Sequence, residues 1–414
     1  MEFVRGLRCV CCDAVYSTRV PYTCPACGIE GILDVEYDYP AIARRLTRRQ
    51  LAARPQRDHW RYRELLPIGE NAVLPAVPVG WTPIVDARSL ARHVGVGTLY
   101  LKDDGRNPSG SLKDRASSIG VVKAREKRRP IIACASTGNA ASSCAGMAAS
   151  MGMASVIFVP QRAPEPKVTQ LLIFGATVLR VRGSYEDAFQ LSQRTSEQMG
   201  WYNRNCAINP YLVEGKKTAG LEACEQLDWE VPEWVAVSVG DGCTIAGIWK
   251  GFREMHALGL TRRTPRMLGV QAEGAAPIAE AWRTGRDARP MEPHSIADSI
   301  AVGVPRNWRK ALLAIRESGG AMIGVSDAEI LDAMRYTGRL AGVFAEPAAA
   351  AAVAGLRRAA AKGLIGRRAT ALAMITGNGL KDTQSARAAV GEPFEVGPKG
   401  AGLGASLRRR KLVE

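Results

Sequence analysis

Short apolar runs alternate with segments of helical apolar spacing from about residue 91 to residue 390. The expected strands are 98–104, 131–136, 154–160, 177–181, 235–240, 267–272 and 371–377, and the expected helices include 111–126, 138–152, 165–176 and 185–200. Alternation of this kind builds parallel sheets that carry helices on both faces. The pattern therefore predicts an α/β fold whose ligands bind beyond the carboxyl ends of the strands.

The alanine-rich segment 346–363 looks like low complexity but has the features of a closely packed helix. Pro347 suits the first turn of a helix and Gly363 suits its end. We therefore expect a buried helix here, not a disordered linker.

Four regions follow from the changes in composition along the chain. Residues 1–40 form a small N-terminal module, and 41–90 form a basic linker and helical segment that ends in a Pro/Gly-rich stretch. Residues 91–390 form the main α/β region, in which about 125–215 make a smaller domain inserted between parts of a larger one. Residues 391–414 are a basic tail.

The N-terminal module carries two CxxC pairs, Cys9/Cys12 and Cys24/Cys27. Four thiolates on two tight knuckles can close a tetrahedral Zn²⁺ site, and they leave no open coordination position for catalysis. The alternative is a remnant in which Cys11 or a missing ligand spoils binding. We expect a zinc-ribbon-like module with a structural Zn²⁺.

Composition adds little that is specific. The hydrophobic share of 46% is typical of a globular protein, and no stretch has the apolar length of a signal peptide or a membrane span. We expect a cytoplasmic protein without a membrane partner. The net charge of +16 lies partly in basic runs such as 44–57 and 407–411, which are more often solvated than bound to nucleic acid. A nucleic-acid partner is therefore unlikely.

Three expected strands are followed by loops with chemistry-bearing residues. The first loop leads to Lys113 at the start of a helix, and the second, 136–140, offers hydroxyls and backbone N–H groups suited to a carboxylate. The third, 238–247, is a glycine loop suited to a phosphate, although it matches neither a Walker loop nor the dinucleotide fingerprint. Together they predict a site that holds a phosphorylated aldehyde on a lysine and grips an amino-acid carboxylate.

The text of these loops resembles that of the threonine synthase family of pyridoxal-phosphate enzymes, which have the tryptophan-synthase-β fold (fold type II). NPSGSLKDR resembles NPTGSFKDR, CASTGNAASS resembles CASTGNTAAS, and NPYLVEGKKT resembles NPxRxEGQKT. PRMLGVQAEGAAPI, FAEPAAAAAVAG and ITGNGLKD are also close to family text, so the resemblance runs from about 60 to 390. It implies two parallel-sheet α/β domains, a pyridoxal 5'-phosphate cofactor, a small amino-acid substrate and, by analogy, a homodimer.

The resemblance also implies roles for single residues. Lys113 would carry the cofactor as a Schiff base and then move protons at the substrate carbons, for which burial and nearby cations favour its neutral form. Asn139 would bond the phenolic oxygen of the cofactor, and Thr376 would face its pyridine nitrogen. A neutral hydroxyl there favours elimination and replacement over transamination. The substrate carboxylate would be held by Ser136, Thr137, Gly138 and Asn139, and the cofactor phosphate by Gly240, Asp241, Gly242, Cys243 and Thr244.

Several positions depart from the family text. Asp241 and Cys243 replace residues of GNAGN, and an aspartate suits a phosphate cup only if its side chain points away. Around the expected substrate phosphate, Leu212 replaces an arginine, Ala140 a threonine, and Cys206 and Ala207 an Asn-Ser pair. Such losses can cost several powers of ten in affinity at roughly 1.5–3 kcal/mol for each charge-assisted bond. Arg106, in place of a leucine, is a candidate substitute cation.

These departures leave the substrate open. O-phosphohomoserine, converted with water to threonine and phosphate, is the leading hypothesis. The alternatives are a threonine/serine dehydratase or a cysteate-synthase-like β-replacement enzyme that uses phosphoserine or another activated serine. A silent zinc-ribbon binding protein is a further alternative, which the intact Lys113 disfavours.

Overall fold

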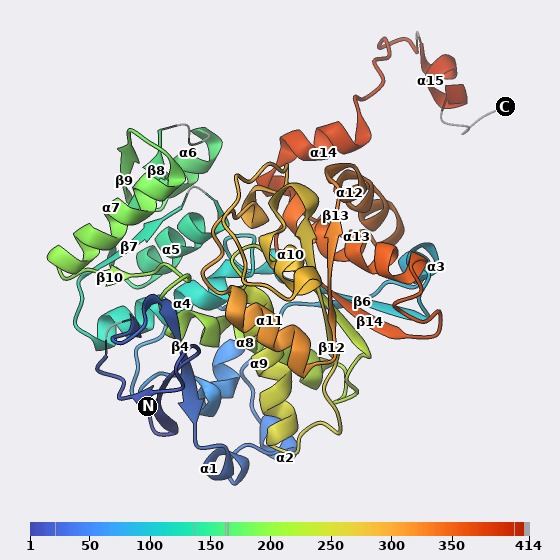
Figure 1. Ribbon diagram of the computed structural model, residues 1–414. Helices are drawn as coiled ribbons and strands as arrows, with labels where there is room; N and C mark the ends of the chain where they lie inside the picture. Colours follow the sequence, from blue (N-terminus) through green and yellow to red (C-terminus); the bar gives the residue numbers. More distant parts are fainter. Residues whose placement is uncertain (21, 137, 162, 164, 401, 410–414) are drawn as a thin grey trace.

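The computed structural model describes residues 1–409 apart from 21, 137, 162, 164 and 401 (Figure 1). Its strands form three sheets, with orders β2-β1-β4-β3, β10-β7-β8-β9 and β13-β12-β11-β14-β6-β5. The strands are β1 Val4–Cys9, β2 Val15–Tyr16, β3 Thr23–Cys24, β4 Gly28–Tyr37, β5 Ile84–Asp86, β6 Thr98–Asp103, β7 Ile131–Ala135, β8 Ala154–Pro160, β9 Thr177–Val181, β10 Tyr202–Asn203, β11 Trp234–Ser238, β12 Arg266–Ala272, β13 Ala321–Val325 and β14 Thr370–Ile375.

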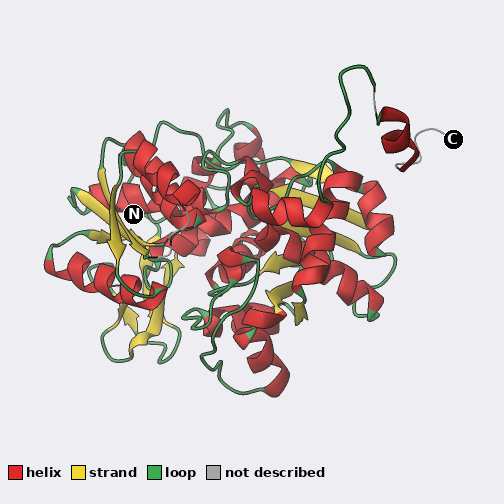
Figure 2. Ribbon diagram, turned by 90° about the horizontal axis from the view of Figure 1, so that it is seen from above, coloured by secondary structure: helices red, strands yellow, loops and turns green. Residues whose placement is uncertain are grey.

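Helices surround the two larger groups of strands (Figure 2). They are α1 Tyr39–Ala43, α2 Arg48–Ala52, α3 Arg88–Val94, α4 Lys113–Glu126, α5 Asn139–Ser150, α6 Glu165–Ile173, α7 Tyr185–Gln198, α8 Tyr211–Gln226, α9 Cys243–Ala257, α10 Pro277–Thr284, α11 Trp308–Glu317, α12 Asp327–Ala341, α13 Pro347–Ala361, α14 Thr383–Val390 and α15 Leu403–Arg409. The predicted α/β fold with parallel sheets is confirmed.

The six-stranded sheet is buried on both faces, which explains why its strands have continuous apolar runs. In β11, Val235 and Val237 pack into a core with α8, α9 and α11, while Ala236 packs with α12 and α13 on the other face. Alternate side chains of a strand point to opposite faces, so a strand covered on both sides has no polar alternation. The alanine-rich α13 lies close to the sheet: a Cβ built at Gly355 would meet Val270 Cγ2 at 2.3 Å.

Two strands of this sheet, β13 at one edge and β5 at the other, were not predicted. The three-residue β5 lies within the segment 41–90 that the sequence indicated as linker and helix, and it pairs antiparallel with β6 at the sheet edge. It is too short for an alternating pattern, and the prolines around it are typical of loops.

The second parallel sheet, β7 to β10, forms the part of the molecule shown in green in Figure 1. One face packs on α5 and α6, where Ile132 and Ile157 lie with Ala145 and Leu171. The other face packs on α7. The carboxyl ends of its strands and those of the larger sheet meet at the same region of the molecule, which positions the site described below.

The N-terminal antiparallel sheet is docked on the larger region. Leu33 and Val35 of β4 belong to the same apolar core as α8 and α9, and Lys250 Nζ donates to the carbonyl oxygen of Val35 at 2.6 Å. Tyr37 Oη donates to Glu214 Oε2 at 2.7 Å. Residues 1–40 therefore share their core with the rest of the protein.

The C-terminal segment leaves the body of the protein after α14, and α15 stands apart from it (Figures 1 and 2). No helix among the described residues combines the length and apolar content needed to cross a membrane.

Candidate active site

A cavity of about 670 Å³ lies between the two parallel sheets at the carboxyl ends of their strands. Its wall contains most of the residues that the sequence singled out, although they come from segments far apart in the chain. These are Lys113, Ser136, Gly138, Asn139, the whole loop Gly240–Thr244 and Thr376. Thr137 lies outside the described residues.

Three helices begin at this cavity. Lys113 is the first residue of α4, Asn139 the first of α5 and Cys243 the first of α9. Among the described residues, no side chain caps any of these three N-termini. Because the first N–H groups of a helix lack intrahelical partners and carry partial positive charge, the cavity favours anionic ligands.

The environment of Lys113 suits a lysine that must lose its proton. Burial lowers the pKa of the Lys113 ammonium, and the positive charge of Lys216 lowers it further, while Glu346 and two cysteines oppose this effect. No described residue hydrogen-bonds to Lys113 Nζ. The amine is therefore free to react with a ligand in the cavity.

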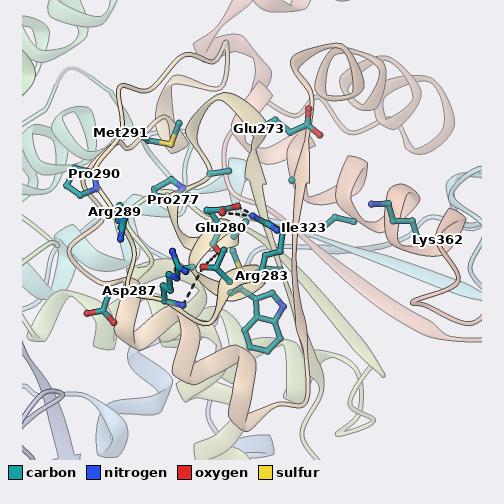
Figure 3. A pocket seen from close by; sticks show the side chains of 18 residues that line it. Glu273, Pro277, Glu280, Arg283, Asp287, Arg289, Pro290, Met291, Ile323 and Lys362 are labelled. Carbon is teal, nitrogen blue, oxygen red and sulfur yellow. Dashed lines mark hydrogen bonds and ion pairs between the residues drawn. The ribbon is translucent and has the colours of Figure 1, made fainter.

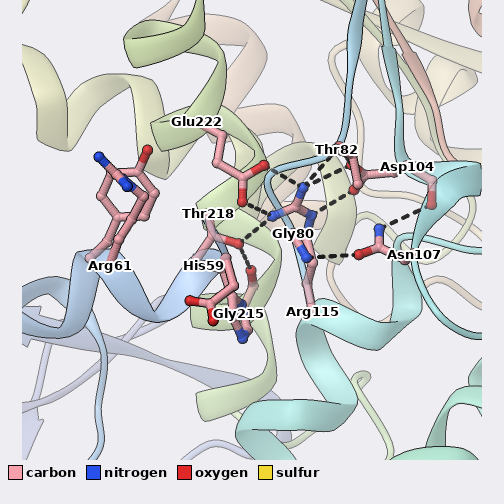
Figure 4. A network of polar contacts seen from close by, with 12 residues as sticks. His59, Arg61, Gly80, Thr82, Asp104, Asn107, Arg115, Gly215, Thr218 and Glu222 are labelled. Atoms are coloured by element: carbon pink, nitrogen blue, oxygen red, sulfur yellow. Dashed lines mark hydrogen bonds and ion pairs between the residues drawn. The ribbon is translucent and has the colours of Figure 1, made fainter. Parts of the chain in front are cut away.

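A buried ionic network fixes the helix that presents Lys113 (Figure 4). Arg115, two residues further along α4, donates to Asp104 at 2.6 and 2.8 Å and to Glu222 on α8 at 2.6 and 2.8 Å. Its Nη1 also donates to Thr218 Oγ1 at 2.8 Å. The start of α4 is thereby held between the 3₁₀ turn that follows β6 and helix α8.

Asn139 is paired with a carboxylate that the sequence analysis did not single out. Its Nδ2 donates to Glu346 Oε1 at 2.8 Å and Oε2 at 2.9 Å. Burial raises the pKa of Glu346, although the hydrogen bond from Asn139 and the charge of Lys113 act against the rise. Glu346 stands in the quoted text FAEPAAAAAVAG just before α13, so its apolar context hid it from a search for polar clusters.

The glycine loop after β11 has the backbone of an anion-binding cup. Gly242 has φ +102°, and a Cβ there would lie 2.6 Å from the carbonyl oxygen of Asn307, so only glycine fits. The Asp241 carboxylate is engaged by two residues of another segment of the chain. Its Oδ1 accepts from the backbone N–H of Arg306 at 2.8 Å and its Oδ2 from Asn307 Nδ2 at 2.7 Å. Both oxygens of this carboxylate therefore already have protein donors.

Two buried polar groups on the wall have no protein partner. Ser238 and Asn205 line the cavity, and neither the buried Oγ of Ser238 nor the buried Nδ2 of Asn205 hydrogen-bonds to a described residue. Orphaned polar groups are costly unless a ligand or water satisfies them. With the uncapped helix ends and the free amine of Lys113, they fit a phosphorylated aldehyde such as pyridoxal phosphate.

Arg106 is not brought to the site. It lies in a short 3₁₀ turn, Asp104–Arg106, is exposed and does not line the cavity. Its closeness to Lys113 in sequence therefore does not bring its side chain to the cavity wall. Leu212 is also absent from the wall and packs toward Gly120 of α4.

The wall carries cations that the sequence analysis missed. Arg204, Lys216 and Arg306 line it, and Lys216 and Arg204 converge on the thiols of Cys243 and Cys206. One signal was available in the sequence, because Lys216 stands where the quoted family text has a glutamine. Ala140, Cys206 and Ala207 also line the cavity.

A second hollow of about 740 Å³ lies beside α10 (Figure 3). Its charged wall includes the ion pair of Glu280 with Arg283 on adjacent turns of that helix, together with Asp287 and Arg289. It contains none of the predicted site residues. The chemistry lies in the smaller cavity.

The four predicted metal ligands come together at the N-terminal sheet. The Sγ atoms of Cys9, Cys12, Cys24 and Cys27 all lie within 4.8 Å of one another, and Cys12 and Cys24 are 3.8 Å apart. In a tetrahedron with Zn–S bonds of about 2.3 Å the sulfurs are about 3.8 Å apart. Cys11 is not part of the cluster and interacts with the carbonyl oxygen of Glu30.

Comparison with known proteins agrees with this site. The pyridoxal-phosphate dependent enzyme family matches residues 76–377, so the fold is that of a pyridoxal-phosphate enzyme. Solved structures of similar fold include threonine deaminase isoform 2 from Solanum lycopersicum, with a TM-score of 0.65 and 22% identity over 75% of this chain and 87% of that one. Maize serine racemase has a TM-score of 0.62 and 22% identity over 72% and 88%.

Closer sequence relatives define the family more narrowly. The threonine synthase of Methanocaldococcus jannaschii is 38% identical over 94% of this chain and 96% of its own length. That of Methanosarcina acetivorans is 42% identical over 94% and 95%. The chain belongs to the threonine synthase family and is a pyridoxal-phosphate-dependent lyase with threonine-synthase-like function.

Proposed function

We propose that the enzyme converts O-phosphohomoserine and water into threonine and phosphate. The observation that carries this proposal is the free amine of Lys113 in a cavity lined by three helix N-termini, in a chain whose curated relatives are named threonine synthase. The substrate has a carboxylate and a phosphate, and the positive electrostatics of the cavity suit both.

Each residue has a part in this proposal. Lys113 would hold the cofactor and afterwards move protons at the substrate carbons, which requires the neutral amine that its surroundings favour. Ser136, Thr137, Gly138 and Asn139 would hold the substrate carboxylate. Pyridoxal phosphate supplies an aldehyde that joins the amino group of the substrate and a ring that withdraws electrons from its bonds.

The cofactor itself would be oriented from two sides. The loop Gly240–Thr244 would grip its phosphate through backbone N–H groups at the start of α9. Asn139 would bond its phenolic oxygen, and the neutral hydroxyl of Thr376 would face its ring nitrogen, which favours elimination over transamination.

A second candidate is β-replacement or dehydration on a serine-type substrate. The observation that favours it is that Cys206, Ala207 and Ala140 line the cavity where the family text has polar residues. The substrate pocket therefore differs from that of the family text.

One panel of substrates separates the two candidates. The purified holoenzyme is offered O-phosphohomoserine, O-phosphoserine, threonine and serine, each with and without sulfite or sulfide, and phosphate, ammonia, 2-oxo acid and amino-acid products are measured. Threonine and phosphate from O-phosphohomoserine support the first candidate. Inactivity on that compound with turnover of another supports the second.

We also propose that Cys9, Cys12, Cys24 and Cys27 hold a structural Zn²⁺. Their mutual distances fit a tetrahedral site, and Gly31 leaves room for it: a Cβ there would meet the Cβ atoms of Cys24 and Cys27 at 2.5 and 2.7 Å. Four sulfur ligands leave no position for a reacting water, so the ion would stabilise the module.

A further inference from the structure

Two buried cations on the wall of the cavity have no carboxylate partner among the described residues. Lys216 Nζ donates to Cys243 Sγ at 2.6 Å. Arg204 donates to Ser117 Oγ at 3.0 Å and to Cys206 Sγ at 3.4 Å. The two cations are 0% and 1% exposed. A charge removed from water in this way is costly unless another charge compensates it.

Fully buried cations elsewhere in the protein are matched by carboxylates. Lys217 lies between Glu214 and Glu254, and Arg115 pairs with Asp104 and Glu222. Buried cations with a structural role in this protein therefore form salt bridges with carboxylates. Lys216 and Arg204 are equally buried, but neither makes a salt bridge to a carboxylate of the described residues.

The carboxylates on the cavity wall are already engaged with other groups. They are Glu346 with Asn139, Asp241 with the backbone of Arg306 and the side chain of Asn307, Glu186 with the Arg306 guanidinium, and Asp298 with Lys167. Within the described part of the wall, none of these carboxylates makes a salt bridge to Arg204 or Lys216.

The two thiols compensate only part of the charge. A hydrogen bond from Cys243 lowers the pKa of Cys206 well below its ordinary value, and nearby cations add to this effect against burial. Cys243 shifts in the opposite direction, because the same hydrogen bond and burial raise its pKa. A thiolate at Cys206 would balance one of the two cations and leave the other to an anion that enters the cavity.

The position of Lys216 relates it to the arginine of the family text. Leu212, which replaces that arginine, and Lys216 are four residues apart on α8 and so lie on the same side of the helix. Leu212 is outside the cavity wall, whereas Lys216 is part of it. Lys216, which replaces a glutamine of the family text, thus places a cation on the cavity wall one helical turn after Leu212.

We propose that Lys216 and Arg204 bind an oxyanion on the side chain of the substrate, of the phosphate-ester class. This inference rests on the proposed function and names the residues that select its substrate. The backbone N–H groups of the loop Gly240–Thr244 would hold the cofactor phosphate, and Lys216 contacts this loop only through the side chain of Cys243, which leaves the pair for the substrate. A phosphate bound here would also displace the negative charge of Cys206 and favour its thiol form.

The first test is Lys216→Gln, which restores the residue of the family text. We expect KM for O-phosphohomoserine to rise about tenfold or more, as for loss of a charge-assisted hydrogen bond. The inhibition constant of threonine, which has no phosphate, and the affinity of the apoenzyme for pyridoxal phosphate should not change. A loss of cofactor affinity with KM unchanged would assign Lys216 to the cofactor phosphate and overturn the proposal.

The second test does not depend on turnover. Iodoacetamide labelling of Cys206 in the holoenzyme is followed by peptide mass mapping, with inorganic phosphate as the probe. Phosphate should slow labelling in the wild type and in the control Arg125→Gln, whose exposed side chain lies outside the cavity. It should protect Lys216→Gln much less. Equal protection in all three proteins would refute the subsite, even if O-phosphohomoserine proves not to be a substrate.

Discussion

Arg115 and Glu222 form a fully buried ion pair in which Nη1 of the guanidinium lies 2.6 Å from Oε1 of the carboxylate. Asp104 accepts from the other edge of the guanidinium (Figure 4). Lys102 Nζ completes the set by donating to Glu222 Oε2 at 2.7 Å. Two cations thus balance two carboxylates without help from solvent. Because Arg115 is two residues from Lys113, this neutral network also positions the reactive amine.

Arg115→Met should therefore destabilise the protein strongly. It leaves two buried carboxylates with one cation, and breaking a buried pair in this way costs about 3–5 kcal/mol. Arg88→Met is the matched control, because Arg88 pairs with Asp86 on the surface and surface pairs contribute about 0–1 kcal/mol. Urea unfolding of both variants measures the difference. Equal losses in the two would show that the buried network adds nothing beyond a surface pair.

His59 should make the folded state sensitive to acid. Burial lowers its pKa to about 3 from an ordinary 6.5, and the charge of Arg115 lowers it as well. A group with a depressed native pKa stabilises the fold above its unfolded pKa, and this stability is lost as the pH falls from about 6.5 towards 3. The loss for one group is about 1.4 kcal/mol per pH unit.

Unfolding free energies at a series of pH values test this effect. Wild type should lose stability relative to His59→Leu as the pH falls, because the variant has no imidazole to protonate. His294→Leu, at an exposed position, should follow the wild type. A constant difference across the range would mean that His59 is not held neutral in the native state.

Much of the fold could be predicted from the sequence because the patterns that indicate its strands and loops are local. The buried strands are continuous apolar runs, and the loops after them have their glycines and hydroxyls within a few residues. The same locality explains the error at Arg106, which is near Lys113 in sequence but turned to solvent. It also explains the missed β5, whose pairing depends on β6 and not on its own pattern.

The cationic part of the cavity could not be predicted from local sequence patterns. Arg204 and Cys206 follow β10, Lys216 is within α8 and Cys243 begins α9. Only the folded chain brings these segments together, and each residue alone looks like an ordinary basic or small core position. Comparison with the family text marked Cys206 and Cys243 as departures. The text does not show that the two thiols interact with each other, or that Arg204 and Lys216 donate to them.

Removing zinc should destabilise the N-terminal module and the elements that it contacts. Cys24→Ser takes away one of four clustered thiols, so we expect loss of bound zinc and a thermal midpoint several degrees lower. Cys11→Ser, next to the cluster in sequence but outside it, should retain metal and stability. Metal analysis and thermal unfolding of both proteins make the comparison. Full stability of Cys24→Ser without metal would refute a structural role.

Lys113→Ala should abolish turnover and leave the fold intact. No described residue hydrogen-bonds to the Lys113 amine, so its removal orphans no polar partner and also relieves the cost of a lysine whose pKa burial lowers. We expect activity to fall by at least about 10³-fold, because covalent attachment and proton transfer are lost together. Urea unfolding should show stability equal to or above that of the wild type.

The control is Lys127→Ala, at the far end of the same helix, which should keep wild-type activity. Borohydride reduction of the wild-type holoenzyme followed by peptide mass mapping supplies an independent measurement. It should place the pyridoxyl group on Lys113 and on no peptide of the variant. Lys216 also lines the cavity, but its pKa is raised, whereas that of Lys113 is lowered. A pyridoxyl group on Lys216 instead would therefore contradict the roles proposed for the two lysines.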